Sequence, residues 1–399
     1  SADRISTLIG EFIPGEAAPR HGPGAVSDLR SGSYKYNFPA WSPSLERIFP
    51  YDEFGSTGFD LMDRLQSDGI DIPFVEGRSV LIDVPKTMKG PRLIAKEPTC
   101  NQWIQQSIAK FLASRIEGTS LSLSVRLRDQ SYNGKLALLG SRNGKYGTLD
   151  LKSASDRLSC RLVQRVFRKN PFLLESFRAC RTRFLENGID KKNASLIKLR
   201  KFSTQGSALT FPVQTLVFLS IVLGVGRHLT QGRLDWRQLG RRVRVYGDDI
   251  VAPSGWLPTL ASALTLLGLK VNDTKTFYEG NFRESCGTDG WMGYEVTPPH
   301  VTTCVDRSKP GTVASWVAVS NNFFKKGFWA ASNWMSSTIR MDLIPTVNHG
   351  SGVFGFTSFS KVSAPLSKRW NDRLHYFEHR VLAVKAKASI VKQDTATAL

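Results

Sequence analysis

Two adjacent aspartates in the stretch RRVRVYGDDIVAPSG, residues 241–255, have the side chains and spacing of a metal site. In the first half of the stretch valines alternate with polar residues, which predicts a strand with one apolar face. Gly247 and Asp248 then form a tight turn, in which glycine takes the positive φ of a type II′ geometry, and the return strand follows. We therefore expect Asp248 and Asp249 at the exposed tip of a hairpin.

Two carboxylates held so close repel each other unless a cation lies between them. Hard oxygen ligands without a nearby His or Cys suit Mg²⁺ or Mn²⁺ better than zinc. Asp150, about 100 residues upstream, also follows a predicted strand, as two neighbouring strands of one sheet would allow. Three carboxylates could hold two cations and support an in-line phosphoryl displacement. The alternative is that Gly-Asp-Asp is an ordinary surface turn.

The elements around these residues indicate an α+β fold. Strands are expected near residues 80–99 and 145–151, and helices over 101–116, 157–167, 211–226 and 257–269; a basic helix is expected over 365–388. The run 211–226 is apolar but short and contains Gln214, so we expect a buried helix rather than a membrane span. The order of these elements favours a sheet with helices on one face.

The composition points to a polyanionic partner. The sequence has 54 Lys and Arg against 34 Asp and Glu, a net charge of +20, which favours nucleic acid over the alternative of a solvated basic surface. The five cysteines are odd in number and form no Cys-x-x-Cys pair, which argues against a zinc ribbon or a disulfide framework and for a reducing compartment. The sequence begins at Ser1, with no secretory signal and no initiator Met. We therefore expect a processing boundary or a cut at this point.

Several motifs, in order, resemble one family. They are HGPGAVSDLR, KYNFPAW, VPKTMKGPR with KEPT, DLKSASD, VYGDDI, KTFYEGNFRESCG and VTPPH. Over roughly residues 20–300 they resemble the replicase subunit of the single-stranded RNA bacteriophages, the levivirus type. The last hundred or so residues match less distinctly, and the chain is shorter than a typical replicase of that family. YGDD and DLKSASD, with QGSALT between them, also resemble the palm of viral RNA-dependent RNA polymerases more generally.

The resemblance implies a right-hand polymerase with fingers, palm and thumb and an antiparallel palm sheet backed by helices. The fingers would take residues 1–145, with a basic nucleotide-entry loop near 86–96, and an insertion, 168–204. The palm would take 146–167 and 205–297, the second part holding the GDD hairpin and a primer-grip hairpin; the thumb and C-terminal basic helices would take 298–399.

The resemblance also implies the roles of the carboxylates and of one lysine. Asp150, Asp248 and Asp249 would be the metal ligands for two Mg²⁺ ions, with Mn²⁺ as a substitute. Asp156 would lie near the sugar of the incoming nucleotide; the alternative is an N-cap of the helix that follows. Lys275 would lie near the leaving pyrophosphate, where a proton donor could assist catalysis.

Further residues are implied to contact the nucleotide or the RNA strands. The nucleotide set is Lys86, Lys89, Arg92, Lys96, Asp156, Ser203, Gly206, Ser207 and Thr210, with Gly206 as a hinge and the hydroxyls as donors. The basic loop alone could equally be a solvated face. Arg283, Tyr246 and Gly247 are the primer and template contacts, and Cys286 is expected to be a packed thiol. Gln214 stands where many viral polymerases have Asn, which weakens any role for it in sugar selection.

The sequence therefore predicts an RNA-directed RNA polymerase that replicates a phage-type genome by two-metal-ion nucleotidyl transfer from ribonucleoside triphosphates. Two alternatives stay open: a non-catalytic RNA-binding protein with a polymerase-like fold, and a reverse transcriptase, against which Gly247 and the lack of an aromatic gate after Asp150 argue. By resemblance, the partners are template and product RNA, host translation elongation factors and a ribosomal RNA-binding protein, in the cytoplasm of a bacterial host. No membrane is expected.

Overall fold

A computed structural model describes most of the chain. The described residues are 1–29, 35–36, 38–55, 72–87, 90–190, 195–301, 304–306, 309–339, 344–349, 354–359 and 368–379. They divide into two compact units, the first comprising Ser1–Val84 and Arg92–Thr297, the second Pro85–Pro91 and Pro298–Leu399. The boundary between Thr297 and Pro298 is also where the expected second palm segment ends.

The first unit contains most of the helices. They are α1 (Ala2–Ile9), α2 (Pro43–Glu46), α3 (Tyr51–Phe54), α5 (Thr99–Glu117), α6 (Ser131–Asn143), α7 (Ala154–Arg157), α8 (Cys160–Phe167), α9 (Pro171–Cys180), α10 (Thr210–Leu229), α11 (Trp236–Arg241) and α12 (Leu257–Leu266). The expected helices over 101–116, 157–167, 211–226 and 257–269 correspond to α5, α8, α10 and α12. Two of the starts carry the capping chemistry that helix ends require: the Ser159 hydroxyl accepts from Leu162 N, and Asp235 forms a capping box with Gln238.

This unit contains a three-stranded antiparallel sheet that carries the aspartate hairpin, and we call it the central sheet. Its order is β3 (Tyr146–Leu149), β8 (Asp249–Pro253) and β7 (Arg244–Tyr246). Leu149 and Ile250 are paired and join the main core, whereas the next pair, Thr148 and Val251, points to the opposite face, because side chains alternate along a strand.

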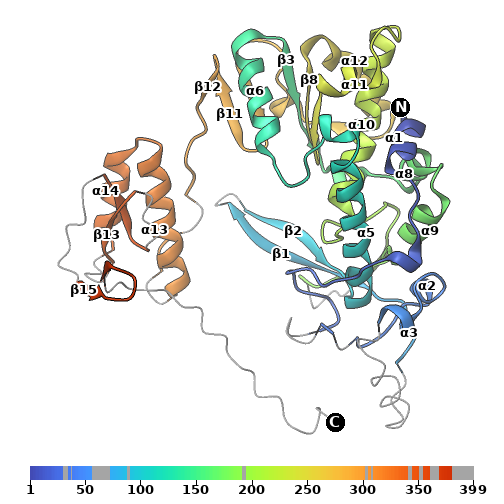
Figure 1. Ribbon diagram of the computed structural model, residues 1–399, viewed down its shortest axis with the longest axis horizontal. Helices are drawn as coiled ribbons and strands as arrows, with labels where there is room; N and C mark the ends of the chain where they lie inside the picture. Colours follow the sequence, from blue (N-terminus) through green and yellow to red (C-terminus); the bar gives the residue numbers. More distant parts are fainter. Residues whose placement is uncertain are drawn as a thin grey trace. The chain divides into compact units, whose positions relative to one another are not determined.

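Helices cover both faces of this sheet. Figure 1 shows α6 on one side of β3 and β8 and the group α10 to α12 on the other. The expectation of helices on one face is therefore wrong. The face that carries Thr148 and Val251 is also buried, both residues being 1% exposed or less, and α6 supplies the cover.

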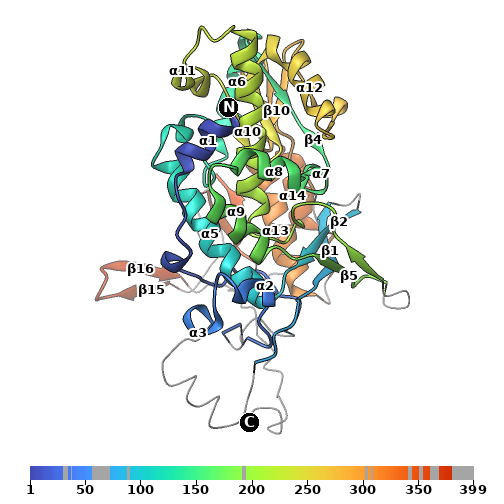
Figure 2. The same ribbon diagram turned by 90° about the vertical axis from the view of Figure 1, so that its right-hand side faces the viewer.

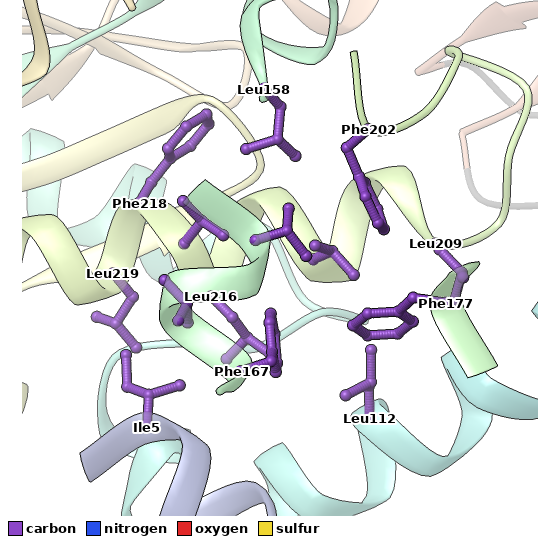
Figure 3. Close-up of a cluster of buried hydrophobic side chains, with 14 of the residues drawn as sticks. Ile5, Leu112, Leu158, Phe167, Phe177, Phe202, Leu209, Leu216, Phe218 and Leu219 are labelled. Atoms are coloured by element: carbon purple, nitrogen blue, oxygen red, sulfur yellow. The ribbon is translucent and has the colours of Figure 1, made fainter. Parts of the chain in front are cut away.

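Helix α10 runs through the main core of the first unit. Its Leu216, Phe218 and Leu219 pack with side chains from α1, α5, α8 and α9, among them Ile5 and Phe177 (Figure 3). The helix is long and apolar enough to cross a membrane, but 78% of its apolar window is buried inside the protein. The prediction of a buried core helix is confirmed.

A second sheet, most of whose residues belong to this unit, has the order β2-β1-β5-β6, and Figure 2 shows β1, β2 and β5 together. The strands are β1 (Ser79–Thr87), β2 (Gly90–Lys96), β5 (Phe184–Asn187) and β6 (Leu196–Lys198). β1 and β5 are parallel and β5 and β6 antiparallel. The expected pair of strands near 80–99 is confirmed as β1 and β2.

Two smaller strand groups complete the surroundings of the central sheet. β4 (Leu151–Lys152) pairs with β9 (Lys270–Val271), and β10 (Phe282–Ser285), β11 (Thr288–Trp291) and β12 (Tyr294–Glu295) form an antiparallel meander. Thr148 of β3 also exchanges backbone hydrogen bonds with Phe277. Phe277 therefore lies at the free edge of β3.

The second unit has its own small core. The helices α13 (Pro310–Lys325) and α14 (Trp329–Ser337) pack together, with the parallel strands β13 (Thr346–Asn348) and β14 (Phe356–Ser358) beside α13. Buried Trp316, Val317 and Met335 lie in this core.

The described part of the expected C-terminal basic helix is a hairpin. β15 (Lys368–Asn371) and β16 (Tyr376–His379) are antiparallel, so the helix predicted over 365–388 is wrong for these residues. The side chain of Asn371 accepts from the backbone N–H of Arg373 and of Leu374, an Asx turn that reverses the chain. This local turn competes successfully with the helical spacing of the apolar residues.

Candidate active site

The two adjacent aspartates lie at the hairpin between β7 and β8. Tyr246 pairs with Asp249, so Gly247 and Asp248 form a two-residue turn. Gly247 has a φ of 63°, which confirms the predicted positive φ. The hairpin tip is not exposed as expected, because Gly247 is buried and both aspartates are half-buried.

Helix α10 fixes this turn from one side. The Gly247 N–H donates to the Thr215 hydroxyl at 2.9 Å, and a Cβ at Gly247 would lie 3.0 Å from the Phe211 ring. The Phe211 and Tyr246 rings meet edge to face with centroids 4.7 Å apart. The turn thus needs glycine both for its φ and for its close approach to the helix.

The register of the central sheet brings Asp150 beside this hairpin. Leu149 of β3 pairs with Ile250 of β8 in antiparallel register, so the next residue, Asp150, lies at the same edge as Asp249. At Asp150 the chain leaves β8, and its carbonyl accepts instead from the Asn272 N–H at 2.9 Å. The predicted neighbourhood of the two strands is confirmed.

Neutral donors orient two of the carboxylates. The Asn272 amide donates to Asp150 Oδ2 at 2.7 Å. Cys286 N donates to Asp249 Oδ1 at 3.0 Å and the Ser285 hydroxyl donates to the same oxygen at 3.4 Å. In the described part of the chain no donor reaches Asp150 Oδ1 or Asp249 Oδ2, which leaves one oxygen of each carboxylate for a ligand.

The β10–β11 turn brings its donors to Asp249 through an uncommon backbone conformation. Cys286 and Gly287 have φ of 51° and 74°, the positive values of a tight hairpin turn. Burial raises the pKa of the Cys286 thiol, and the nearby Asp249 charge raises it further. A thiol of this kind is a packed side chain, as predicted, and the backbone N–H is what acts on Asp249.

The electrostatics of the site favour a bound cation. Burial, and then the charges of Asp248 and Asp150, raise the pKa of Asp249 to about 6. The Lys275 ammonium donates to Glu284 Oε1 at 2.6 Å; this bond raises the lysine pKa, and the charges of Asp150 and Asp249 raise it further. Lys275 therefore lies in the field of the carboxylates, but it is paired with Glu284.

The donor set fits a hard divalent cation. Carboxylate oxygens that are crowded, partly desolvated and each left with an open position are the ligands that Mg²⁺ and Mn²⁺ prefer. Within the described residues no three His, Cys, Asp or Glu side chains are already gathered in coordinating positions. Binding a cation at Asp150, Asp248 and Asp249 would thus draw these side chains closer together.

Asp156 makes no described contact with the three carboxylates Asp150, Asp248 and Asp249. It lies in the first turn of α7, is exposed and forms an ion pair with Lys201. The alternative that Asp156 caps the following helix is wrong, because Ser159 caps α8. A contact with the sugar of a nucleotide stays a prediction.

The loop before α10 is packed rather than open. The Ser203 and Thr210 hydroxyls, both buried, hydrogen bond to each other at 2.7 Å, and Ser207 Oγ accepts from Leu209 N. A Cβ at Gly206 would lie 1.4 Å from the Ala95 carbonyl oxygen, so only glycine fits there. The hinge and the nucleotide contacts of this loop stay predictions.

The basic loop is described only in part. Arg92 is exposed and Lys96 is half-buried in β2. Lys89 and the side chain of Lys86 lie outside the described residues. The four residues are not brought together by any described contact, so their role in nucleotide entry stays a prediction.

Arg283 is not the surface residue that was predicted. It is 0% exposed, and its guanidinium donates to the carbonyls of Tyr146, Glu279 and Gly280 and to two others nearby. The structure therefore contradicts a contact between Arg283 and a primer phosphate. The side chain instead ties β10 to the start of β3. Tyr246 is half-buried and packed on Phe211, and its contact with RNA stays a prediction, as does that of Gly247.

Sequence reasoning missed the residues that orient the carboxylates. Asn272, Ser285 and the Cys286 N–H bond the carboxylates, and the Asn133 amide donates to the backbone carbonyl of Asp249 at 3.2 Å; each donor lies at least 36 positions along the chain from the aspartate that it contacts. The only local signal is that Asn272 precedes a short turn after an apolar strand, a position where an amide caps backbone groups. Donors that act across a fold leave no periodic pattern.

The sequence is similar to a known protein family and to several of its members. Residues 67–310 match the family model described as RNA replicase, beta-chain. The chain is 34% identical over 225 residues to the RNA-directed RNA polymerase beta chain of Enterobacteria phage fr, which covers 56% of this chain and 38% of the relative. It is 30% identical over 335 residues to the RNA-directed RNA polymerase subunit beta of Escherichia virus Qbeta, covering 82% of this chain and 51% of the relative. The chain thus spans about half the length of these relatives, or less.

Among solved structures, the RNA-dependent RNA polymerase of a human picorbirnavirus matches with a TM-score of 0.45 and 11% identity, over 65% of this chain and 55% of that chain.

Proposed function

The chain belongs to the RNA replicase beta-chain family, and from this premise we propose that it is the catalytic part of an RNA-directed RNA polymerase that replicates a phage-type RNA genome. The observation that carries the proposal is the sheet register that sets Asp150 beside the Asp248–Asp249 turn. Relatives named as RNA-directed RNA polymerases support it over an ordinary surface turn.

The proposed chemistry is nucleotidyl transfer with two divalent cations. Asp150, Asp248 and Asp249 would hold Mg²⁺, and Mn²⁺ would substitute for it because both ions prefer oxygen ligands. When bound, such ions activate the attacking hydroxyl and stabilise the leaving pyrophosphate. The protein's own part is orientation: Asn272 and the 285–286 turn each hold one carboxylate oxygen, so that the other oxygen faces the ligand position.

Lys275 is proposed as the proton donor to the pyrophosphate. It lies close enough to Asp150 and Asp249 for their charges to raise its pKa. A raised pKa keeps the amine protonated, so that it carries a proton and a positive charge to the leaving phosphate oxygen as negative charge develops there. Its bond to Glu284 would be exchanged for one to the pyrophosphate.

The remaining predicted contacts with the nucleotide are also part of the proposal. Asp156, held by Lys201, would sense the ribose, and Arg92 and Lys96, with Lys86 and Lys89, would guide the triphosphate. Guanidinium and ammonium groups suit that task because a triphosphate is strongly anionic. We assign residues 1–145 and 168–204 to fingers, 146–167 and 205–297 to palm, and 298–399 to thumb.

The proposed partners are RNA and further protein subunits. The Qbeta virus relative is named a subunit, which supports assembly with other chains. Host translation elongation factors and a ribosomal RNA-binding protein are the partners that the family resemblance implies, in the bacterial cytoplasm. The net charge of +20 supports salt-dependent binding of template RNA.

Primed synthesis tests the proposal. Purified chain is given a primed RNA template, labelled ribonucleotide and Mg²⁺ or Mn²⁺, beside two variants, Asp248→Asn and Glu117→Gln. Glu117 is an exposed carboxylate paired with Arg128 at 3.6 Å and serves as the matched control. Template-dependent product from the original and from Glu117→Gln, and none from Asp248→Asn, is the expected result.

The other outcomes separate the alternatives. If neither the original nor the variants are active, bacterial lysate is added. Activity that then appears and depends on Asp248 supports a polymerase that needs host subunits. RNA binding without synthesis under both conditions supports the non-catalytic RNA-binding protein. Product on deoxyribonucleotides in place of ribonucleotides would favour a reverse transcriptase. Equal synthesis by Asp248→Asn contradicts the assigned metal site.

A further inference from the structure

The second unit carries a cluster of exposed aromatic side chains that its own core does not use. Phe359 is 68% exposed and Trp329 is 58% exposed, although both are large and apolar. The Phe359 ring lies 4.7 Å from the Phe324 ring and 6.2 Å from the Trp329 ring, centroid to centroid. The three rings come from the end of α13, the start of α14 and the residue after β14.

Two lysines lie beside these rings. Lys325 is the last residue of α13 and Lys326 is its C-cap, and both are exposed. We call Phe324, Trp329, Phe359, Lys325 and Lys326 the aromatic surface. Residues 309–339, which form the two helices shown in Figure 1, contain no Asp or Glu at all. The surface therefore combines apolar rings with positive charge.

The combination of exposed aromatic rings and lysines favours nucleic acid over a protein partner. Centres of protein–protein interfaces are enriched in aromatic residues but depleted of lysine. Single-stranded nucleic acid, by contrast, is bound by aromatic rings on which bases stack, next to cations that contact the phosphates. The core of the unit, with Trp316 and Met335, is complete without the three rings, so burial on folding does not explain them.

We propose that the aromatic surface binds single-stranded RNA, with bases stacking on Trp329 and Phe359 and phosphates near Lys325 and Lys326. The inference rests on the proposed function only in naming RNA as the ligand class. It adds a contact site outside the carboxylate edge, on the second unit, that tolerates any base because every base has a flat apolar face.

Binding without synthesis tests this surface. The full chain is titrated into labelled oligouridine of about 12 nucleotides, in EDTA and without nucleotides, and into an abasic strand of the same length and charge. The variants are Trp329→Ala with Phe359→Ala, Lys325→Gln with Lys326→Gln, and Trp334→Ala as the control. Trp334 is 62% exposed on the same helix, but its ring packs towards Trp316.

Loss of the two rings is expected to weaken oligouridine binding roughly tenfold and to leave binding of the abasic strand unchanged. Loss of the lysines should weaken both strands alike and reduce the salt dependence. Cross-links from 4-thiouridine should map to the peptides that contain Trp329 or Phe359. Unchanged melting temperatures show that the variants are folded.

Two results would overturn the proposal. In the first, the ring variant binds oligouridine as the original does. In the second, the ring variant keeps RNA binding but loses an added protein subunit, which would make the surface a protein contact. Neither result depends on catalysis, so a chain that fails to synthesise RNA can still pass this test, and an active polymerase can still fail it.

Discussion

Two carboxylates in the first unit, Glu97 and Asp249, show how similar groups come to serve different ends. Glu97, 1% exposed, accepts four hydrogen bonds, from Ser79 and Thr204 on one oxygen and from Gln105 and Thr182 on the other. Asp249 accepts its bonds on Oδ1 alone and shares its surroundings with two further carboxylates.

The difference lies in what the fold leaves unsatisfied. Every acceptor position near Glu97 is filled by a neutral donor, so this side chain joins β1, β2, α5 and the loop before α10 without needing a ligand. Asp249 receives hydrogen bonds on Oδ1 only, and the negatively charged Asp248 and Asp150 lie near it. A buried acid with its hydrogen bonds complete is structural, whereas one with an open oxygen and like-charged neighbours requires a cation.

The largest expected effect is on synthesis. Asp249→Asn should lower the rate of ribonucleotide incorporation by roughly a thousandfold or more, since it removes a ligand of the ions that stabilise the transition state. The same substitution should not lower the free energy of unfolding, because it also removes a repelling charge. Rate and stability are measured on the same preparation; a parallel loss of both would make Asp249 a structural residue like Glu97.

A pH dependence of stability follows from the same carboxylate. The folded state raises the pKa of Asp249 from 3.8 to about 6, so this group's contribution to stability is fully present below pH 3.8 and is lost as the pH rises to about 6. The cost above that pH is about 3 kcal/mol. In denaturant unfolding with EDTA, the original should lose stability relative to Asp249→Asn as the pH rises from 3.8 to about 6, with no further loss above that.

Divalent cations supply the control for this measurement. Millimolar Mg²⁺ or Mn²⁺ should stabilise the original above pH 6 and close the gap to Asp249→Asn, because a bound ion offsets the charge repulsion. A gap that does not change with pH, or that Mg²⁺ does not reduce, would contradict a cation site at this edge.

Glu97→Gln is the matched amide substitution at the other carboxylate. One acceptor oxygen becomes a donor, so two of the four donors must turn round or lose their partner, and the free energy of unfolding should fall by about 2 kcal/mol. Synthesis per folded molecule should stay near the original value. Thermal or denaturant unfolding checks the first expectation, and a specific loss of activity at full stability would refute the structural assignment of Glu97.

The sequence was sufficient for the hairpin and for Asp150, since alternation of valines and a glycine turn are local patterns. It was insufficient for Glu97 and Asn272, whose partners are separated from them by up to 122 residues. Arg283 shows the converse error. A basic residue in a family motif was taken as an RNA contact, but its donors satisfy backbone carbonyls.

The helix predicted in the C-terminal region is wrong for a different reason. The apolar spacing over 365–388 suits a helix, yet Asn371 supplies a turn that closes a hairpin instead. Short-range side-chain to backbone bonds of this kind compete with helix formation and are not visible in a hydrophobic pattern.

Asn272 is the intermediate case, and it carries the smallest effect. It gives Asp150 a single donor, where Glu97 receives four and Asp249 two. Asn272→Ala should therefore lower incorporation by about tenfold, because Asp150 loses its orientation but keeps its charge. The loss should shrink as the Mg²⁺ concentration is raised, and RNA binding should not change. A purely structural role for Asn272 would instead lower stability and leave the Mg²⁺ dependence of the remaining activity as in the original, so the metal titration decides whether this amide belongs with Glu97 or with the catalytic edge.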